Sequence, residues 1–219
     1  MAVSKRLQTI VSLIEGNCLA DIGCDHGYVV VEALRQKRIQ KAYACDVAAG
    51  PLRNAQKNIC SHHLEQQVTC LLMDGIKELP DDVDSIVIAG MGASLMIDIL
   101  EQGKGRLKKG MYFYFCPHKD ASLLREYVSS HGLFIQKECM VEEDGHFYPI
   151  MKLVLTHIPY TLTPQEIYYG VSCIRDKTYI SFIQKEYDKW QRIVLQMPEN
   201  KREEAYRRLE ILEDLKRQI

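Results

Sequence analysis

The sequence predicts an α/β protein, with a mostly parallel sheet between helical layers and a separate helical segment at the C-terminus. Short apolar runs rich in β-branched residues alternate with helix-like segments from residue 19 to about 131. Two extended stretches follow, and then two stretches with apolar residues three and four apart. Continuous apolar strands are typical of parallel sheets, which are buried on both faces, so helices must cover both sides.

The expected elements follow one another along the chain. The stretch MAVSKRLQTIVSLIEG (1–16) has the pattern of a short amphipathic helix. Strands are expected at 19–23, 41–46, 68–74, 85–90 and 111–116, and helices near 28–37, 51–63, 93–102 and 120–131. The stretch 134–156 has two extended parts around the turn signal EEDG, which predicts an antiparallel hairpin at the sheet edge.

A boundary is expected at IPYTLTPQE (158–166). Thr163 can cap a helix, with Pro164 at its first position and Glu166 completing a capping box. The sequence therefore predicts one domain at 1–158 and a helical domain at 159–219.

Apolar residues in the C-terminal segment have the spacing of a coiled-coil seam. They are Ile180, Ile183, Tyr187, Trp190, Val194 and Met197, followed by Ala205, Leu209, Leu212, Leu215 and Ile219. MPEN (197–200) interrupts the series, and Asn200 is expected to cap the second helix. We expect an antiparallel helical hairpin that either packs on the core domain or protrudes as an arm.

Composition excludes several classes of protein. The 219 residues carry a net charge of −1, with 47% hydrophobic and 26% charged residues, as in ordinary globular proteins. No apolar run reaches the roughly 18–20 residues that span a bilayer, and no signal peptide is recognisable. The eight cysteines form no CxxC pair. We therefore expect a cytoplasmic protein with reduced thiols and neither a metal site nor a membrane partner.

The turn DIGCDHG (21–27), which follows the first strand, has a glycine at each end of a glycine-spaced pattern, but Asp25 stands at its centre. A side chain and a negative charge there disfavour a pyrophosphate, which needs close backbone approach and a positive helix end. S-adenosylmethionine has no phosphate, and its sulfonium and ammonium groups are cationic. Asp21 and Asp25 can attract it, although a plain strand-to-helix turn remains the alternative.

Further polar positions follow other strands. Asp46 ends the second strand, about 20 residues on, where an acid can bind ribose hydroxyls, although capping the next helix is an alternative. Asp74 and Gly75 end the third strand, where a carboxylate can accept from an adenine amino group. In IAGMGAS (88–94), glycines let the backbone lie against a ligand, or simply form a tight turn. These positions share the carboxyl edge, where such sheets bind ligands.

The stretches DIGCDHGYVVVEAL, ACDVAAGPLRNAQKNI and VIAGMGASLMIDIL resemble the bacterial tRNA (adenine-22-N1)-methyltransferases, the TrmK family. The resemblance extends over nearly the whole chain. It implies a Rossmann-like class I methyltransferase sheet with an antiparallel edge hairpin, S-adenosylmethionine as cofactor, and a C-terminal coiled-coil-like domain that helps to bind tRNA. The N/D-P-P-Y tetrad of many amino-group methyltransferases is absent.

The resemblance assigns a set of cofactor residues. They are Asp21, Gly23, Asp25 and His26 in the loop, Asp46 and Val47 at the ribose, Asp74 and Gly75 at the adenine, and Ala89, Gly90, Met91 and Gly92 at the methyl donor. Two positions depart from the family. Ala93 replaces a glycine, and Cys116-Pro117-His118 stands where the family often has Q-P-N. The second departure leaves the contact to the target base open.

The implied reaction is direct attack of adenine N1 on the methyl group, which needs alignment and stabilisation of the cationic purine more than a strong base. Asp25 is the candidate for that stabilisation, with cofactor binding alone as its alternative role. His26 is expected either to contact the base or a phosphate or to be structural.

The target base is expected to leave its stack. Candidate aromatic contacts are Tyr28, Tyr114, His118, Phe147 and Tyr148, with core packing as the alternative for each. Candidate phosphate contacts are Lys104, Arg106, Lys108 and Lys109 in one loop, and Lys201, Arg202, Arg207 and Arg208 in the helical segment, with solvated charged faces as the alternative. A monomer is expected.

Two other functions remain open from the sequence. One is a class I methyltransferase acting on a small molecule or a protein. The other is a non-catalytic RNA-binding module that retains a pocket for S-adenosylmethionine.

Overall fold

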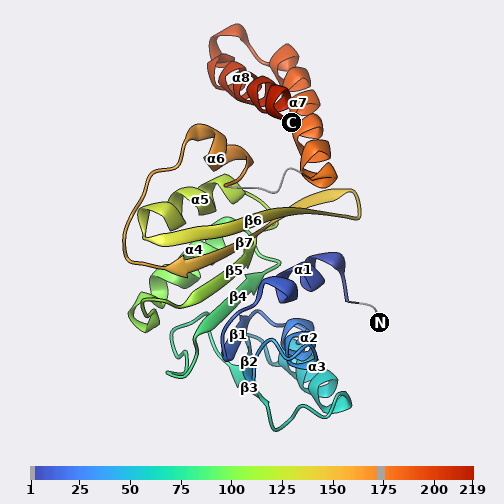
Figure 1. Cartoon of the computed structure of the whole chain (residues 1–219), viewed down its shortest axis with the longest axis vertical. Helices are drawn as coiled ribbons and strands as arrows, with labels where there is room; N and C mark the ends of the chain where they lie inside the picture. The colour runs from blue at the N-terminus through green and yellow to red at the C-terminus, as the bar shows by residue number, and fades with distance from the viewer. Residues whose placement is uncertain (1–2, 172–175) are drawn as a thin grey trace.

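The computed structural model describes residues 3–171 and 176–219, apart from the side chain of Lys201. Within these residues, seven strands form one sheet in the order β3-β2-β1-β4-β5-β7-β6 (Figure 1). The strands from β3 to β5 are parallel, whereas β7 runs antiparallel to both β5 and β6. The predicted parallel sheet with an antiparallel edge hairpin is therefore confirmed.

The strands lie close to their predicted positions. They are β1 (Cys18–Ile22), β2 (Lys41–Asp46), β3 (Val68–Leu72), β4 (Ser85–Ala89), β5 (Tyr112–Cys116), β6 (Leu133–Glu143) and β7 (His146–Leu155). The main difference is β3, which ends two residues earlier than expected. The hairpin turn falls at Asp144 and Gly145, inside the predicted EEDG, and both residues have positive φ.

The α-helices of the described residues are α1 (Lys5–Leu13), α2 (Tyr28–Arg35), α3 (Ala49–Ser61), α4 (Ala93–Gln102), α5 (Ala121–Ser130), α6 (Pro164–Tyr169), α7 (Lys177–Gln196) and α8 (Glu203–Gln218). The first five cover the two faces of the sheet, α1 to α3 on one face and α4 and α5 on the other. In β4, Val87 packs toward α1, α2 and α3, whereas Ile86 and Ile88 pack toward α4 and α5. This alternation explains why the parallel strands are apolar at almost every position.

Helix α6 begins with the predicted capping box. Thr163 Oγ1 accepts from the Glu166 backbone amide at 3.3 Å, and Glu166 Oε2 accepts from the Thr163 amide at 2.8 Å. Leu162 and Val171, on either side of this helix, belong to the core on the α4–α5 side of the sheet. The domain division at 158/159 stays a prediction.

The helices α7 and α8 form a hairpin that projects beyond the β6 edge of the sheet (Figure 1). A third apolar cluster joins the hairpin to the rest of the molecule. Its buried members are Met140, Tyr169, Tyr179, Ile183, Leu212 and Leu215. The base of the hairpin therefore packs on β6 and α6, while its far end extends away from the sheet.

Three details of the predicted helical segment are wrong. Ile180 and Ile219 are 40% and 38% exposed, because Tyr179 takes the buried place at the start of α7 and Ile219 lies beyond the end of α8. Asn200 does not cap α8. It lies inside a 3₁₀ turn, η2 (Glu199–Lys201), and Arg202 precedes the helix without a side-chain capping bond.

Candidate active site

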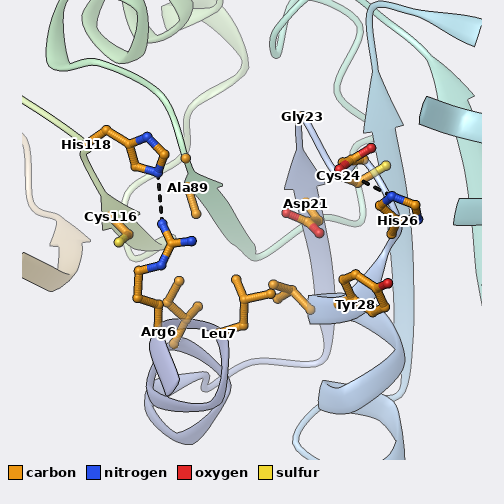
Figure 2. Close-up of a pocket in the computed structure, with 14 residues that line it drawn as sticks. Arg6, Leu7, Asp21, Gly23, Cys24, His26, Tyr28, Ala89, Cys116 and His118 are labelled. Atoms are coloured by element: carbon orange, nitrogen blue, oxygen red, sulfur yellow. Dashed lines mark hydrogen bonds and ion pairs between the residues drawn. The ribbon is translucent and has the colours of Figure 1, made fainter. Parts of the chain in front are cut away.

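A cavity opens at the carboxyl ends of β1 and β4. From these two neighbouring strands the chain continues outward in opposite directions, to β2 and to β5. Such a switch point is where open α/β sheets bind their ligands. The cavity is lined by residues of α1, of the turn after β1, of the start of α2, and of the ends of β4 and β5 (Figure 2).

The turn after β1 contains residues in the left-handed backbone conformation. Gly23 has φ 74°, and the methyl end of Met91 lies where a Cβ on this glycine would be. Asp25 has φ 46°, which aspartate tolerates better than most residues. The amides of Gly23 and Cys24 both donate to the Cys45 carbonyl, at 2.9 and 3.0 Å, and so hold the turn against β2.

Asp21 lies at the bottom of this cavity and is only 4% exposed. Among the described residues, no group donates a hydrogen bond to its carboxylate. Burial, together with the nearby charge of Asp46, raises the pKa of Asp21 from 3.8 to about 7. A buried carboxylate without a donor is costly, so this position favours a ligand that brings a cation or a donor.

Asp46 fixes the turn rather than lining the cavity. Its Oδ2 accepts from the Asp25 amide at 3.4 Å, and its Oδ1 accepts from the Ala48 amide at 2.9 Å at the start of α3. Val47 beside it is 70% exposed, which leaves its side chain free for an apolar ligand face. Asp74 is exposed and pairs with Lys77, and Gly75 follows it with φ 63°. These residues lie along the same sheet edge, outside the cavity.

The loop after β4 forms the facing wall of the cavity. Ala89 and Gly90 line it, and Met91 reaches across to Gly23. Gly92 caps α4 and lies against Lys119, so the loops after β4 and β5 meet here. Of the predicted cofactor residues, the structure thus brings six into one cavity: Asp21, Gly23, Asp25, His26, Ala89 and Gly90.

Asp25 and His26 lie at the mouth of the cavity. The Asp25 side chain is 67% exposed, and its Oδ2 is 3.7 Å from His26 Nε2. The His26 ring stacks on Tyr28 at 5.3 Å between centroids, and its backbone carbonyl accepts from Asn58 at 2.9 Å. Both side chains can reach a ligand at the entrance.

Helix α1 supplies a wall that sequence reasoning missed. Arg6, Leu7 and Ile10 line the cavity opposite the β1 turn (Figure 2). The Arg6 Nε donates to Glu143 Oε2 at 2.8 Å, and its guanidinium lies 4.3 Å from the centre of the Tyr148 ring. The amphipathic pattern of this helix predicted burial of one face but gave no signal for a site residue.

His118 joins this wall from the loop after β5. Its Nε2 lies 2.8 Å from Arg6 Nη1, and because arginine can only donate, this nitrogen accepts. Partial burial and the Arg6 charge lower the pKa of His118. The contact with Arg6 places the proton of the neutral ring on Nδ1, and Nε2 lies 3.8 Å from the Cβ position of Gly90.

The other aromatic residues predicted to contact the base differ in their distance from the cavity. Tyr114 is wrong as a base contact, because it is fully buried in β5 and its hydroxyl bonds the Glu15 backbone. Tyr28 lines the cavity, and Tyr148 lies against Arg6 and His118. Phe147 lies farther out on the hairpin, edge-on to Phe182 of α7 at 5.6 Å.

The first group of predicted phosphate contacts lies in the loop between α4 and β5. This loop is at the amino-terminal ends of the parallel strands, opposite the carboxyl ends at which the cavity opens. Lys104 pairs with Glu101 at 3.4 Å. Arg106 and Lys108 lie 3.6 and 3.7 Å from Asp81, and Lys109 is exposed. The structure therefore does not bring this loop to the cavity.

The second group lies on the helical hairpin. Arg208 lies between the rings of Tyr168 and Trp190, 3.8 and 4.7 Å from their centres, and pairs with Glu204. It joins α8 to α6 and α7. Arg202 Nε donates to the Met197 carbonyl at 2.8 Å. Arg207 is exposed, whereas the Lys201 side chain lies outside the described residues.

A second cleft begins at His118 and continues toward α7. It is lined by the loop after β5, including Lys119, by Phe147 of β7, and by Lys189 of α7. The cleft thus connects the cavity to the helical hairpin, and it combines an aromatic ring with exposed cations.

The residues present fit S-adenosylmethionine better than a dinucleotide. The unpartnered Asp21 carboxylate and the adjacent Asp46 would repel phosphates but attract ammonium and sulfonium groups. Among the described residues, no group of three or more His, Cys, Asp or Glu side chains could hold a metal ion, and no helix could span a membrane. The seven described cysteines are free, and Cys173 lies outside the described residues.

The sheet order and this cavity define the chain as a methyltransferase of the Rossmann-like α/β class. Residues 3–151 match the methyltransferase domain family. Over 153 residues, the chain is 31% identical to the tRNA (adenine(22)-N(1))-methyltransferase of Bacillus subtilis (strain 168). The match covers 69% of this chain and 64% of that relative, a little under two thirds of its length.

Solved structures extend the similarity over the full chain. M. capricolum TrmK, in complex with S-adenosyl-homocysteine, is 26% identical with a TM-score of 0.85, over 99% of both chains. A Streptococcus pneumoniae protein in complex with S-adenosyl-L-methionine is 27% identical with a TM-score of 0.87, over 98% of this chain and 100% of that one. The chain belongs to the TrmK family, as its sequence motifs indicated.

Proposed function

We propose that this protein transfers a methyl group from S-adenosylmethionine to N1 of adenine 22 in tRNA. The observation that supports this most is the buried, unpartnered Asp21 carboxylate at the switch point of a TrmK-family chain. It suits a cationic cofactor, and a relative of this chain has the name of that activity.

The cofactor would lie along the carboxyl edge of the sheet. Its methionine part would occupy the cavity between Asp21 and the β4 loop, where six of the predicted residues meet. Its ribose and adenine would lie outside the cavity, toward Asp46 and Asp74 with their neighbours Val47 and Gly75. The exposed Val47 side chain is available to pack on the adenine.

When bound, S-adenosylmethionine supplies an electrophilic methyl group. The chain's own residues then align the acceptor, because adenine N1 is nucleophilic without a strong base. The backbone at Gly90 allows close approach, and neutral His118 beside it can donate from Nδ1 to the base. Asp25 at the mouth is positioned to stabilise the cationic purine, or only to help bind the cofactor. His26 would contact the base or a phosphate.

The tRNA would approach along the cleft from His118 to α7. Lys119 and Lys189 would contact phosphates there, and Phe147 offers a ring for a base. The loop of Lys104 to Lys109 and the exposed Arg207 would be secondary contacts with the tRNA body. Because tRNA is the substrate, we propose that the protein acts in the cytoplasm, as a monomer whose two parts divide near residue 158.

The proposal is tested by incubating the protein with S-adenosylmethionine carrying a labelled methyl group and unmodified tRNA transcripts. We expect label in the tRNA and a loss of most of it when adenine 22 is replaced by guanine. Bulk protein and small amines are tested in parallel as control methyl acceptors in place of tRNA. Labelling of these acceptors instead of tRNA would favour a methyltransferase with another substrate, and cofactor binding without any transfer would favour a non-catalytic module.

A further inference from the structure

Two charged side chains are buried outside the active-site cavity, where the proposed reaction gives them no role. Arg125 of α5 is 2% exposed, and Glu138 of β6 is fully buried. We propose that this pair anchors the helical hairpin at the orientation that tRNA binding requires, so that both residues position the tRNA without touching it. The inference rests on the proposed tRNA substrate but not on the atom that is methylated.

The pair holds α6 as well as itself. Arg125 Nε donates to the two carboxylate oxygens of Glu138 at 3.1 and 3.2 Å, and Nη2 donates to Oε1. The remaining hydrogen bonds go to the chain around the end of α6. Arg125 Nη1 donates to the Ile167 carbonyl at 2.8 Å, and Glu138 Oε2 accepts from the Val171 amide at 2.9 Å. The chain is therefore bound on both sides of the point where α6 ends.

Helix α6 connects this pair to the helical hairpin. It has only six residues, too few to be stable alone, and the Ile167 carbonyl is among the last four, which a helix leaves without an internal partner. Tyr169, between the two contacts, is buried in the apolar cluster that joins the hairpin to the rest of the molecule. Because α6 lies between α5 and the hairpin (Figure 1), its angle on α5 sets the direction of the hairpin.

An irregularity in β6 turns the carboxylate inward. The pairing of β6 with β7 shifts between Ile135 and Lys137, so that Gln136 is an extra residue in β6. Ile135 is buried before the bulge, whereas after it Lys137 is exposed and Glu138 is buried. In a regular strand the alternation would bury Lys137 and turn Glu138 outward. The bulge thus places an acid, and not a base, against Arg125.

The pair lies between the two sides of the cleft that leads from His118 to α7. On one side, Arg125 belongs to α5, which directly follows the loop that contains Lys119. On the other side, the chain leads from α6 to α7, which contains Lys189. The separation of Lys119 and Lys189 therefore depends on how α6 is held on α5. Phosphates of a rigid tRNA require one particular separation.

Stability alone does not explain two buried charges at this position. Removal of two charges from water is costly, and apolar side chains of similar volume often give equal or greater stability than a buried pair. Apolar contacts are non-directional, however, and would allow α6 to pack at several angles. The hydrogen bonds of Arg125 and Glu138 have good geometry at one angle only. Orientation is thus what the pair adds.

The test replaces the pair by apolar side chains of similar length, in the full chain, as the double variant Arg125→Met/Glu138→Leu. The single variant Glu138→Gln keeps an acceptor for the Val171 amide. The control is Lys152→Met/Glu15→Gln, because Lys152 is also largely buried and pairs with Glu15 at 2.6 Å, but joins β7 to the segment after α1.

Four properties are measured: the Kd for S-adenosylmethionine by calorimetry, the KM and kcat for tRNA methylation, the urea midpoint, and small-angle X-ray scattering without tRNA. The double variant should raise the KM for tRNA about 10-fold with kcat little changed, as expected when about one molecule in ten has the competent orientation. Its scattering should show a broader distribution of interatomic distances. The Kd for the cofactor and the urea midpoint should stay close to the wild type. Glu138→Gln should raise the KM less, and the control should behave as the wild type.

A double variant with the wild-type KM for tRNA would overturn the inference. Equal weakening of cofactor and tRNA binding would also overturn it, since this would indicate general damage to the sheet. If the double variant does not fold, Glu138→Gln decides, and an unchanged KM for tRNA would refute the anchor. If the wild type neither binds nor methylates tRNA, the proposed substrate is wrong. Scattering then tests the anchor alone, and an unchanged distance distribution in the double variant would refute it.

Discussion

The Asp21 carboxylate should make the ligand-free protein less stable as the pH rises. Its pKa is about 7 in the folded protein, against 3.8 as its ordinary value, because burial and Asp46 disfavour the charge. Below pH 3.8 the group is protonated in both states and has no effect. Between pH 3.8 and 7 only the unfolded state ionises, so stability falls, and the full loss is present above pH 7.

The size of the effect follows from the two pKa values. The difference between 3.8 and about 7 corresponds to an upper limit of about 4 kcal/mol in the free energy of unfolding. Roughly a third of this is already lost at pH 5, so up to roughly 3 kcal/mol remains to be lost between pH 5 and pH 8. Asp21→Asn removes the charge at nearly constant volume and should remove this pH dependence.

The assay is urea unfolding of the wild type and Asp21→Asn at pH 5 and pH 8 without ligand. The variant should gain stability relative to the wild type between these two pH values, whereas Asp74→Asn, at an exposed carboxylate, should not. With saturating S-adenosylmethionine the wild type should be more stable than Asp21→Asn, because the ligand stabilises only the protein that binds it. If the stability difference between Asp21→Asn and the wild type is the same at both pH values, the account of Asp21 is refuted.

Three further predictions concern the turn, the tRNA surface and the hairpin. Asp46→Ala should weaken S-adenosylmethionine binding about 10-fold in calorimetry, because the Asp25 amide loses its acceptor; unchanged binding would contradict this. Lys189→Glu should weaken tRNA binding more than Lys108→Glu and Lys109→Glu combined, as measured by filter binding at fixed salt. The opposite order would mean that tRNA binds at the loop between α4 and β5 instead of the cleft beside α7. Arg208→Ala should lower the free energy of unfolding by about 1–3 kcal/mol, and no change would mean that its ring contacts are weak.

The fold and the aspartates at the strand ends were predictable because they follow from local sequence patterns. Strands buried on both faces are continuous in apolar residues, and the ends of β1 to β4 are marked by a change to Asp or Gly within two residues. Asp21, Asp46 and Asp74 fall at the ends of neighbouring strands, so topology alone brings them to one edge.

The α1 wall was not predictable because its contacts are distant in the chain. Arg6 meets Glu143 and His118 across 137 and 112 residues, and one charged residue on an amphipathic helix gives no hint of either partner. The contacts of Arg208 were not predictable for a related reason. A sequence shows the charge of a side chain but not the rings on which it lies.

The proposed activity transfers the methyl group to one atom of one nucleotide. The most direct test is nuclease digestion of tRNA that has been incubated with the protein and labelled S-adenosylmethionine, followed by mass spectrometry of the fragments. We expect N1-methyladenosine at position 22, in amounts that approach one methyl group per tRNA. A methyl group at another position or on the exocyclic amine, or none in tRNA despite cofactor binding, would contradict it.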